Sequence, residues 1–188
     1  MMGKNVFQQE RFKVVLLLLL LVIFGAKGSA LSKDGPMDQL QRSVDEILKI
    51  LQSAELKVPE KNAERKQLIL SVVTEMFDFQ EMAKSSLGKN WSSISTAEQD
   101  KFVDLFTRLV EQRYIGKIDA YNNQKVVYKK ERVQGNKAII YTDIVDKDLE
   151  IPIDYRLKEK QGKWLIYDLK IENVSLVANY RRDFDSIM

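Results

Sequence analysis

The pattern that most resembles a functional site is a group of acidic residues around one turn in the second half of the chain. Asp143, Asp146, Asp148 and Glu150 lie within one short stretch, and carboxylate oxygens are ligands that calcium prefers. The stretch lacks the alternating acidic ligands and the glycine of an EF-hand loop. We therefore expect a connecting turn there and no bound metal.

Histidine and cysteine, which carry much of enzyme chemistry, are both absent from the 188 residues. Their absence excludes Ser-His-Asp and Cys-His nucleophiles, the usual zinc ligand sets and disulfide bonds. A carboxylate-pair hydrolase or a Ser-Lys enzyme stays open, with Asp154 and Asp168 as the obvious acids of the later strands. We expect Asp168 to bond backbone or arginine groups instead. The sequence thus predicts a protein that is not an enzyme, with no catalytic residue and no cofactor.

The elements that would position any site are helices in the first half of the chain. Apolar residues recur there at steps of three and four, which predicts an amphipathic helix that ends near Leu56 and a second helix over 60–76. The apolar residues of the first helix are Leu40, Val44, Ile47, Leu48 and Leu51. We expect a curved sheet to follow, with these helices on one of its faces.

Capping signals mark two further helices. Asp78 is placed as the N-cap of a short helix that ends at Gly88. Ser95 and Glu98 form a capping box ahead of a long helix over 96–121. The wide, aromatic stripe of this long helix suits a core helix that also borders a cavity.

From Lys125 the hydrophobic period changes to two. Strands are predicted over 126–133, 138–145, 151–159 and 163–172, and their short links favour an antiparallel meander. A last helix is expected over 176–187, with Ser175 as its N-cap. The pattern predicts an α+β domain, with a four-stranded antiparallel sheet, helices on one face and a C-terminal helix.

The first thirty residues have the pattern of a secretory signal peptide. A basic segment precedes an unbroken apolar run of 11 residues over 14–24, and the small residues Gly28-Ser29-Ala30 follow. A membrane-spanning helix needs about 20 apolar residues. We expect cleavage near Ala30 and export to the periplasm of one domain over 31–188; an uncleaved signal anchor is the alternative.

Removing that segment leaves a chain without net charge. Residues 1–30 hold four of the 30 basic residues and one of the 27 acidic residues, which leaves 26 of each over 31–188. A neutral chain has no strong field for phosphate backbones. We therefore expect no nucleic acid as a partner.

An ordered series of short motifs spans nearly all of residues 31–188. In the first half they are Phe77-Asp78-Phe79, Met82-Ala83, Leu87-Gly88, Trp91, Phe102, Phe106 and Tyr114. In the second half they are Gly135, Ala138, Thr142, Tyr155-Arg156-Leu157, Gly162-Lys163-Trp164, Tyr167-Asp168, Val174-Ser175-Leu176-Val177, Asn179-Tyr180-Arg181 and Phe184. The set resembles the MlaC family, the toluene-tolerance group of periplasmic lipid carriers of diderm bacteria. It departs at Asn173, where the family usually has glycine, and asparagine tolerates the same left-handed backbone.

The resemblance implies a cone similar to nuclear transport factor 2 (NTF2), with lipid tails between the sheet and the helices. It implies a phospholipid carrier between an outer-membrane lipoprotein complex and an inner-membrane ABC transporter of the Mla type. We expect a monomer. The alternatives are an exported adaptor without ligand and a hopanoid-linked lipid carrier of the same family.

Within that fold, the lining of the lipid pocket is predicted from the apolar stripe of the long helix and from the period-two alternation of the strands. The predicted lipid-binding residues are Phe106, Val110, Tyr114, Ile118, Ile151, Ile153, Tyr155 and Tyr167.

Overall fold

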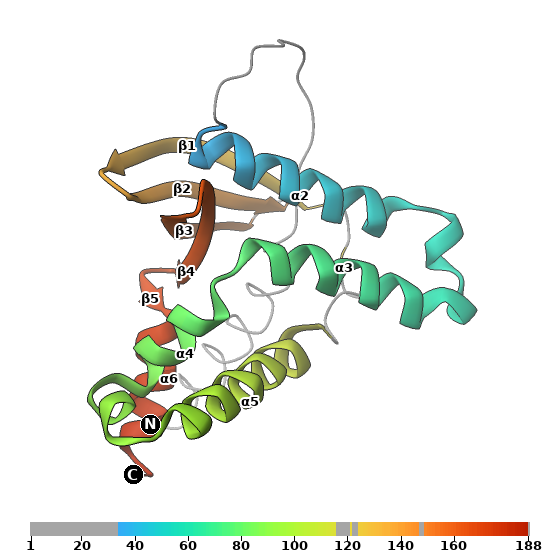
Figure 1. Cartoon of the computed structure of the whole chain (residues 1–188). Coiled ribbons are helices and arrows are strands. Elements are labelled where there is room, and N and C mark those ends of the chain that lie inside the picture. The colour runs from blue at the N-terminus through green and yellow to red at the C-terminus, as the bar shows by residue number, and fades with distance from the viewer. Residues whose placement is uncertain (1–33, 116–120, 122–123, 147–148, 188) are drawn as a thin grey trace, which may run out of the picture.

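Residues 34–115, 121, 124–146 and 149–187 are described by a computed structural model of the chain (Figure 1). The predicted signal peptide over 1–30 lies outside the described residues. Within the described ranges, no helix is both long enough and apolar enough to cross a membrane.

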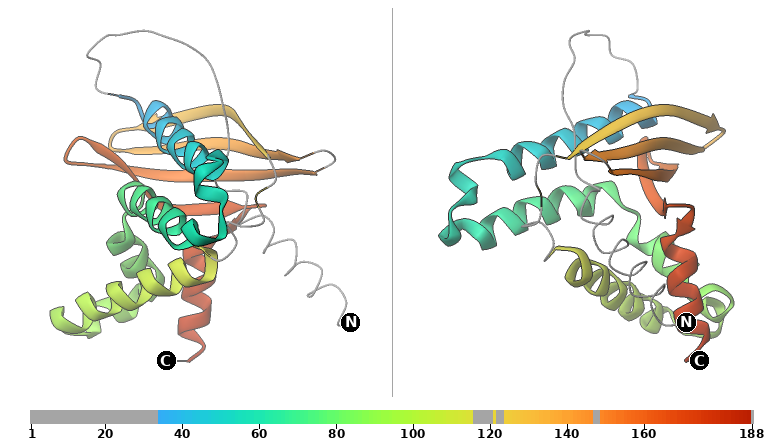
Figure 2. Two further views of the ribbon diagram at one scale, coloured as in Figure 1. Left: turned by 90° about the vertical axis from the view of Figure 1, so that its right-hand side faces the viewer. Right: turned by 180° about the vertical axis from the view of Figure 1, so that it is seen from behind.

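The first two helices form an antiparallel pair that covers one face of the sheet (Figures 1 and 2). They are α2 (Pro36–Gln52) and α3 (Asn62–Met76), joined through the short 3₁₀ turns η2 (Glu55–Lys57) and η3 (Pro59–Lys61). α2 ends at Gln52, before the predicted end near Leu56. Ser53 has an extended backbone, and its hydroxyl oxygen accepts a bond from the Leu56 amide at 3.4 Å, so the side chain competes with helix continuation.

The two predicted caps of the following helices are confirmed. The Asp78 carboxylate accepts a bond from the Glu81 amide at 3.0 Å and begins α4 (Phe79–Leu87), which Gly88 ends with a φ of 61°. The 3₁₀ turn η4 (Gly88–Ser93) leads to α5 (Thr96–Ile115). There the Ser95 amide and hydroxyl donate to the Glu98 carboxylate at 2.8 and 2.7 Å.

The predicted length of the long helix is wrong at its C-terminal end. α5 ends at Ile115 within the described residues, and Tyr121, which was expected to belong to it, is not helical. Gly116 is the next residue in the sequence, and glycine is a poor helix former. The apolar pattern alone does not take account of this low helix propensity.

The four predicted strands are confirmed, but the sheet has five strands rather than four. Its order follows the chain, β1-β2-β3-β4-β5, and every neighbouring pair is antiparallel. The strands are β1 (Lys125–Gln134), β2 (Lys137–Asp146), β3 (Leu149–Lys160), β4 (Lys163–Ile171) and β5 (Val174–Ser175).

The extra strand arises from a tight turn that the sequence analysis did not identify as a hairpin. Glu172 and Asn173 have φ values of 48° and 66°, as the central residues of a type I′ turn require. The turn returns the chain so that Val174 pairs with Ile171. The left-handed backbone expected of Asn173 is therefore confirmed.

Three separate segments form hydrogen bonds with the edge of β4 that does not face β3. The Gln39 side chain of α2 bonds both the amide and the carbonyl of Trp164, at 3.0 and 2.9 Å. Farther along the strand, the Asp78 amide donates to the Ile166 carbonyl at 2.9 Å, and β5 pairs at the far end. An unpaired edge would leave backbone groups open to other chains. This arrangement also ties α2 and α4 to the sheet.

The chain ends with α6 (Leu176–Asp185), which leaves the sheet at β5 and lies beside α4 and α5 (Figure 1). Ser175 caps it as predicted, because its hydroxyl oxygen accepts a bond from the Ala178 amide at 3.0 Å. The α+β architecture, with helices before an antiparallel meander and one helix after it, is the predicted fold class.

Candidate functional site

The inner face of the sheet, which faces α2 and α3, carries a continuous apolar surface. On β3, the side chains of Ile151, Ile153 and Tyr155 are at most 1% exposed. The alternate residues of the same strand, which include Asp154 and Arg156, point to the opposite face, as alternation requires. The predicted division of β3 into an apolar face and a charged face is confirmed by this burial pattern.

Neighbouring strands extend this surface sideways. Thr142 and Ile171 stand opposite Ile153 on β2 and β4. Ile140 and Leu169 stand opposite Tyr155 in the same way. Cross-strand neighbours on one face have their Cβ atoms about 5 Å apart. The inner face is therefore a single uncharged surface across three strands.

The helices supply the other wall of this apolar interior. α2 buries one stripe against the sheet, and α3 and α4 add residues from the side of β4. The residues of α2, α3 and α4 in the same contiguous buried cluster as the sheet residues are Leu40, Val44, Ile47, Leu48, Leu51, Ile69, Val72, Met76, Phe79, Met82 and Ala83. A layer in which helices and strands meet mainly through apolar side chains can exchange those contacts for lipid chains at little cost in polar groups left unpaired.

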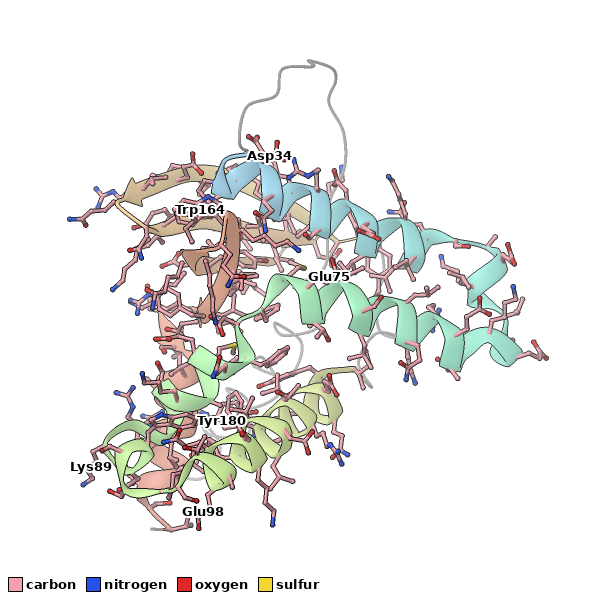
Figure 3. The ribbon with its side chains drawn as sticks, viewed as in Figure 1. Asp34, Glu75, Lys89, Glu98, Trp164 and Tyr180 are labelled. Carbon is pink, nitrogen blue, oxygen red and sulfur yellow. The ribbon has the colours of Figure 1, made fainter. Side chains whose placement is uncertain are left out.

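The structure places two of the predicted residues, Phe106 and Tyr114 of α5, beside α6. The Phe106 ring lies 5.3 Å from the Tyr180 ring and 6.5 Å from the Phe184 ring. Figure 3 labels Tyr180, which belongs to α6. Tyr114, which is partly buried, packs against the same cluster, and the raised pKa of its hydroxyl comes from burial and from nearby Tyr180.

Of the eight predicted lipid-binding residues, the structure brings five into one buried cluster. They are Phe106, Val110, Ile151, Ile153 and Tyr155. Tyr114 packs against that cluster. Tyr167 does not belong to it: this residue has no partner on β3 at an irregularity of the ladder and is partly exposed. Ile118 lies outside the described residues.

Hydroxyl groups on the inner face are the feature that the sequence analysis missed. Tyr128, Thr142 and Tyr155 lie on three adjacent strands, with Tyr128 directly opposite Thr142. The Thr142 hydroxyl donates to the Ile153 carbonyl at 3.0 Å. The hydroxyls of Tyr128 and Tyr155 are buried and bond no described residue. The alternation of Val126 and Tyr128 on β1 was the signal that could have identified Tyr128.

The two acids that a hydrolase would use lie on the outer face of the sheet. Asp168 pairs across the ladder with Arg156 and Asp154 with Lys170. The Asp168 carboxylate accepts bonds from the Ser175 hydroxyl at 2.8 Å and the Val177 amide at 3.1 Å, and lies 3.5 Å from the Arg156 guanidinium. The expectation that Asp168 bonds backbone and arginine groups is confirmed. Partial burial raises the pKa of Asp154.

In this structure, a lysine forms ion pairs with two residues of the acidic stretch first considered for calcium. Lys129 forms an ion pair with buried Asp143, and its ammonium lies 3.4 Å from the Glu150 carboxylate. Asp146 accepts a bond from the Gln124 side chain at 3.1 Å. Asp148 lies outside the described residues. Among the residues that are described, no three acidic side chains form a group that could hold a metal ion.

Comparison with known proteins gives concordant matches. The family model described as "MlaC protein" matches residues 41–188. The chain is 22% identical over 190 residues to the "Intermembrane phospholipid transport system binding protein MlaC" of Haemophilus influenzae, covering 98% of this chain and 88% of that protein. Its fold is similar to a phospholipid-binding protein from Ralstonia solanacearum solved in complex with a phospholipid. That match has a TM-score of 0.70 and 21% identity, over 82% of this chain and 87% of the other.

Proposed function

Because this chain belongs to the MlaC family, we propose that it binds phospholipid and carries it between the outer and inner membranes of a diderm cell envelope. Its exported form would begin near Leu31 and act in the periplasm. The name of the Haemophilus influenzae relative supports the transport role. The Ralstonia solanacearum structure, which contains a phospholipid, supports a fold able to hold such a ligand.

The observation that carries the proposal is the uncharged inner face of the sheet beneath α2 and α3. The side chains of Ile153 and Tyr155 have no exposed surface, while Asp154 and Asp168 lie on the other face of the same sheet. A site for two acyl chains needs an extended apolar lining and no catalytic group. The arrangement fits a binding protein better than a hydrolase.

The physical need for such a carrier follows from the chemistry of lipid. Two acyl chains hold about 30 methylene groups, and each costs about 0.8 kcal/mol to expose to water. The total of about 20 kcal/mol or more prevents free diffusion through an aqueous compartment. A carrier must enclose the tails and can leave the headgroup in water.

The proposed lining combines the eight residues predicted from the sequence. Ile151, Ile153 and Tyr155 would contact the tails from the sheet, and Phe106, Val110 and Tyr114 from α5. Tyr167 and Ile118, which lies outside the described residues, are the other two members of the predicted lining. Tails would enter by separating helices from the sheet and widening the domain toward an NTF2-like cone.

The proposed partners follow from the transport role. A monomer would receive or deliver lipid at an outer-membrane lipoprotein complex and at an inner-membrane ABC transporter complex of the Mla type. We propose no enzymatic step and no cofactor. Transfer would then depend on partners that open the apolar layer at each membrane.

The direct test is native mass spectrometry of freshly purified protein expressed with its full sequence in a diderm host. We expect a mass that begins near Leu31 and carries one phospholipid. A clean apoprotein would favour an adaptor without ligand, and a hopanoid adduct would favour the hopanoid-linked branch. Retention of residues 1–30 on a membrane-bound product would contradict the proposed processing.

A further inference from the structure

Two tyrosine hydroxyls lie inside the apolar layer without a hydrogen-bond partner in the part of the chain that the structure describes. The hydroxyl oxygens of Tyr128 and Tyr155 are shielded from solvent and have no partner among the described residues. The neighbouring Thr142 hydroxyl donates to the Ile153 carbonyl. Most buried polar groups in folded proteins are satisfied, and an unpaired one calls for an explanation.

Their position ties these hydroxyls to the face on which we place the lipid. Tyr128 stands opposite Thr142, and Thr142 stands opposite Ile153, two residues from Tyr155 on the same strand. All four side chains therefore project from the inner face of three adjacent strands. The pKa of each tyrosine is raised by burial, and that of Tyr128 also by nearby Tyr155 and Asp45. The nearby Thr142 hydroxyl offsets only part of the effect of burial on the pKa of Tyr155. Both hydroxyls are therefore neutral donors at physiological pH.

The charges near Tyr128 and Tyr155 determine which kind of hydrogen-bond acceptor these hydroxyls can bind. A buried phosphate or carboxylate needs a paired cation. The charged group that acts on Tyr128 is the Asp45 carboxylate of α2, which would repel a second anion. A neutral carbonyl oxygen has no such requirement, and phospholipids carry two of them in the ester groups that join tails to glycerol.

We infer that the Tyr128 and Tyr155 hydroxyls donate hydrogen bonds to the ester carbonyl oxygens of the bound phospholipid. The inference rests on the proposed function and adds a chemical selectivity to it. The protein would prefer diacyl ester lipids to dialkyl ether lipids of the same length and headgroup. The headgroup would lie outside this contact and need no recognition there.

The experiment compares two lipids that differ only at these carbonyls. Each protein is incubated with vesicles that hold equal amounts of dipalmitoyl phosphatidylglycerol and its dihexadecyl ether analogue, repurified, and analysed for bound lipid by mass spectrometry. The variants are Tyr128→Phe and Tyr155→Phe. Tyr141→Phe is the matched control, because Tyr141 lies on the outer face of β2 beneath the Lys130 ammonium, 4.8 Å from its ring.

We expect the wild-type chain and Tyr141→Phe to prefer the ester lipid, and each inner-face variant to lower that preference about three- to tenfold. Their unfolding midpoints without lipid should not fall, because each change removes an unpaired buried hydroxyl. Equal uptake of both lipids by the wild-type chain would overturn the inference, as would a preference that survives in both inner-face variants. A wild-type chain that takes up neither lipid would instead overturn the proposed function.

Discussion

Ile153 is the residue at which a lipid-lined layer and an ordinary packed core can be told apart. Its side chain has no exposed surface and stands at the centre of the inner face, between Thr142 and Ile171. Adding bulk to a filled core forces neighbours out of their rotamers and costs about 1–3 kcal/mol. A layer that opens for acyl chains accepts extra bulk in their place.

Ile153→Trp should therefore lose bound lipid while keeping its fold. The measurement is bound lipid and the thermal unfolding midpoint on the same preparation. Val127→Trp is the control, because Val127 lies on the outer face of β1 and is 46% exposed; it should keep both lipid and midpoint. If Ile153→Trp unfolds early and still binds lipid, Ile153 belongs to ordinary core and the proposed lining is wrong there.

The buried carboxylate of Asp168 decides how α6 begins. It accepts bonds from the Ser175 hydroxyl and the Val177 amide and faces the Arg156 guanidinium. Hydrogen bonds to a charged group each contribute about 1.5–3 kcal/mol, and negative charge is favourable at a helix N-terminus.

Asp168→Ala should lower the free energy of unfolding by about 3 kcal/mol, because it leaves these buried donors unpaired. Urea unfolding followed by circular dichroism is the measurement. Asp168→Asn, which keeps an acceptor oxygen without the charge, should lose less. Equal losses in the two variants would show that the negative charge, and not the retained acceptor oxygen or the shape of the side chain, holds α6 in place.

At the scale of elements, the junction of α4 and α6 depends on Gly88. Its φ of 61° and ψ of −128° are open to glycine and strained for other residues. A Cβ there would lie 3.3 Å from the Arg181 side chain of α6, whose guanidinium donates to the Ser85 carbonyl at 2.8 Å. A cation thus bonds the last turn of α4, where the helix dipole favours it.

Gly88→Ala should lower the free energy of unfolding by about 2 kcal/mol or more, since it adds backbone strain and displaces Arg181. Gly135→Ala serves as the comparison. Gly135 also has a positive φ, of 59°, but a Cβ there would meet no atom within 4 Å, so only about 1 kcal/mol should be lost. Equal losses measured by urea unfolding would mean that Arg181 contributes nothing to the α4–α6 junction.

At the scale of the whole molecule, charge balance limits what the protein can distinguish. Residues 31–188 contain 26 basic and 26 acidic residues. Arg181, one of the basic residues of the C-terminal helix, donates a hydrogen bond to the Ser85 carbonyl of α4. A neutral protein that holds lipid by its tails has little means of selecting one headgroup.

Lipid extracted from the purified protein should accordingly contain several headgroup classes in rough proportion to the host membrane. Quantitative lipid mass spectrometry of the protein and of the membrane it came from gives the comparison. Strong enrichment of one headgroup, or of a single sterol-like or hopanoid species, would contradict this expectation and indicate a selective site.

Local features of this protein were determined by the sequence itself. Asp78, Ser95 and Ser175 were identified as caps, and the structure shows each of them bonding a backbone or side-chain group three residues away. The alternation on β3 was equally readable, because a strand turns successive side chains to opposite faces. Such features involve neighbours in the chain, so no knowledge of packing is needed.

The partners of those elements were decided only by the tertiary structure. The stripe on α5 predicted a buried face, but not that Phe106 would meet Tyr180 of α6. Gln39 bonds Trp164 across 125 positions of the chain. The hydroxyls of Tyr128 and Tyr155, which have no hydrogen-bond partner among the described residues, come from strands that flank β2 on either side. These contacts depend on the relative orientation of distant elements, which hydrophobic period and capping residues do not encode.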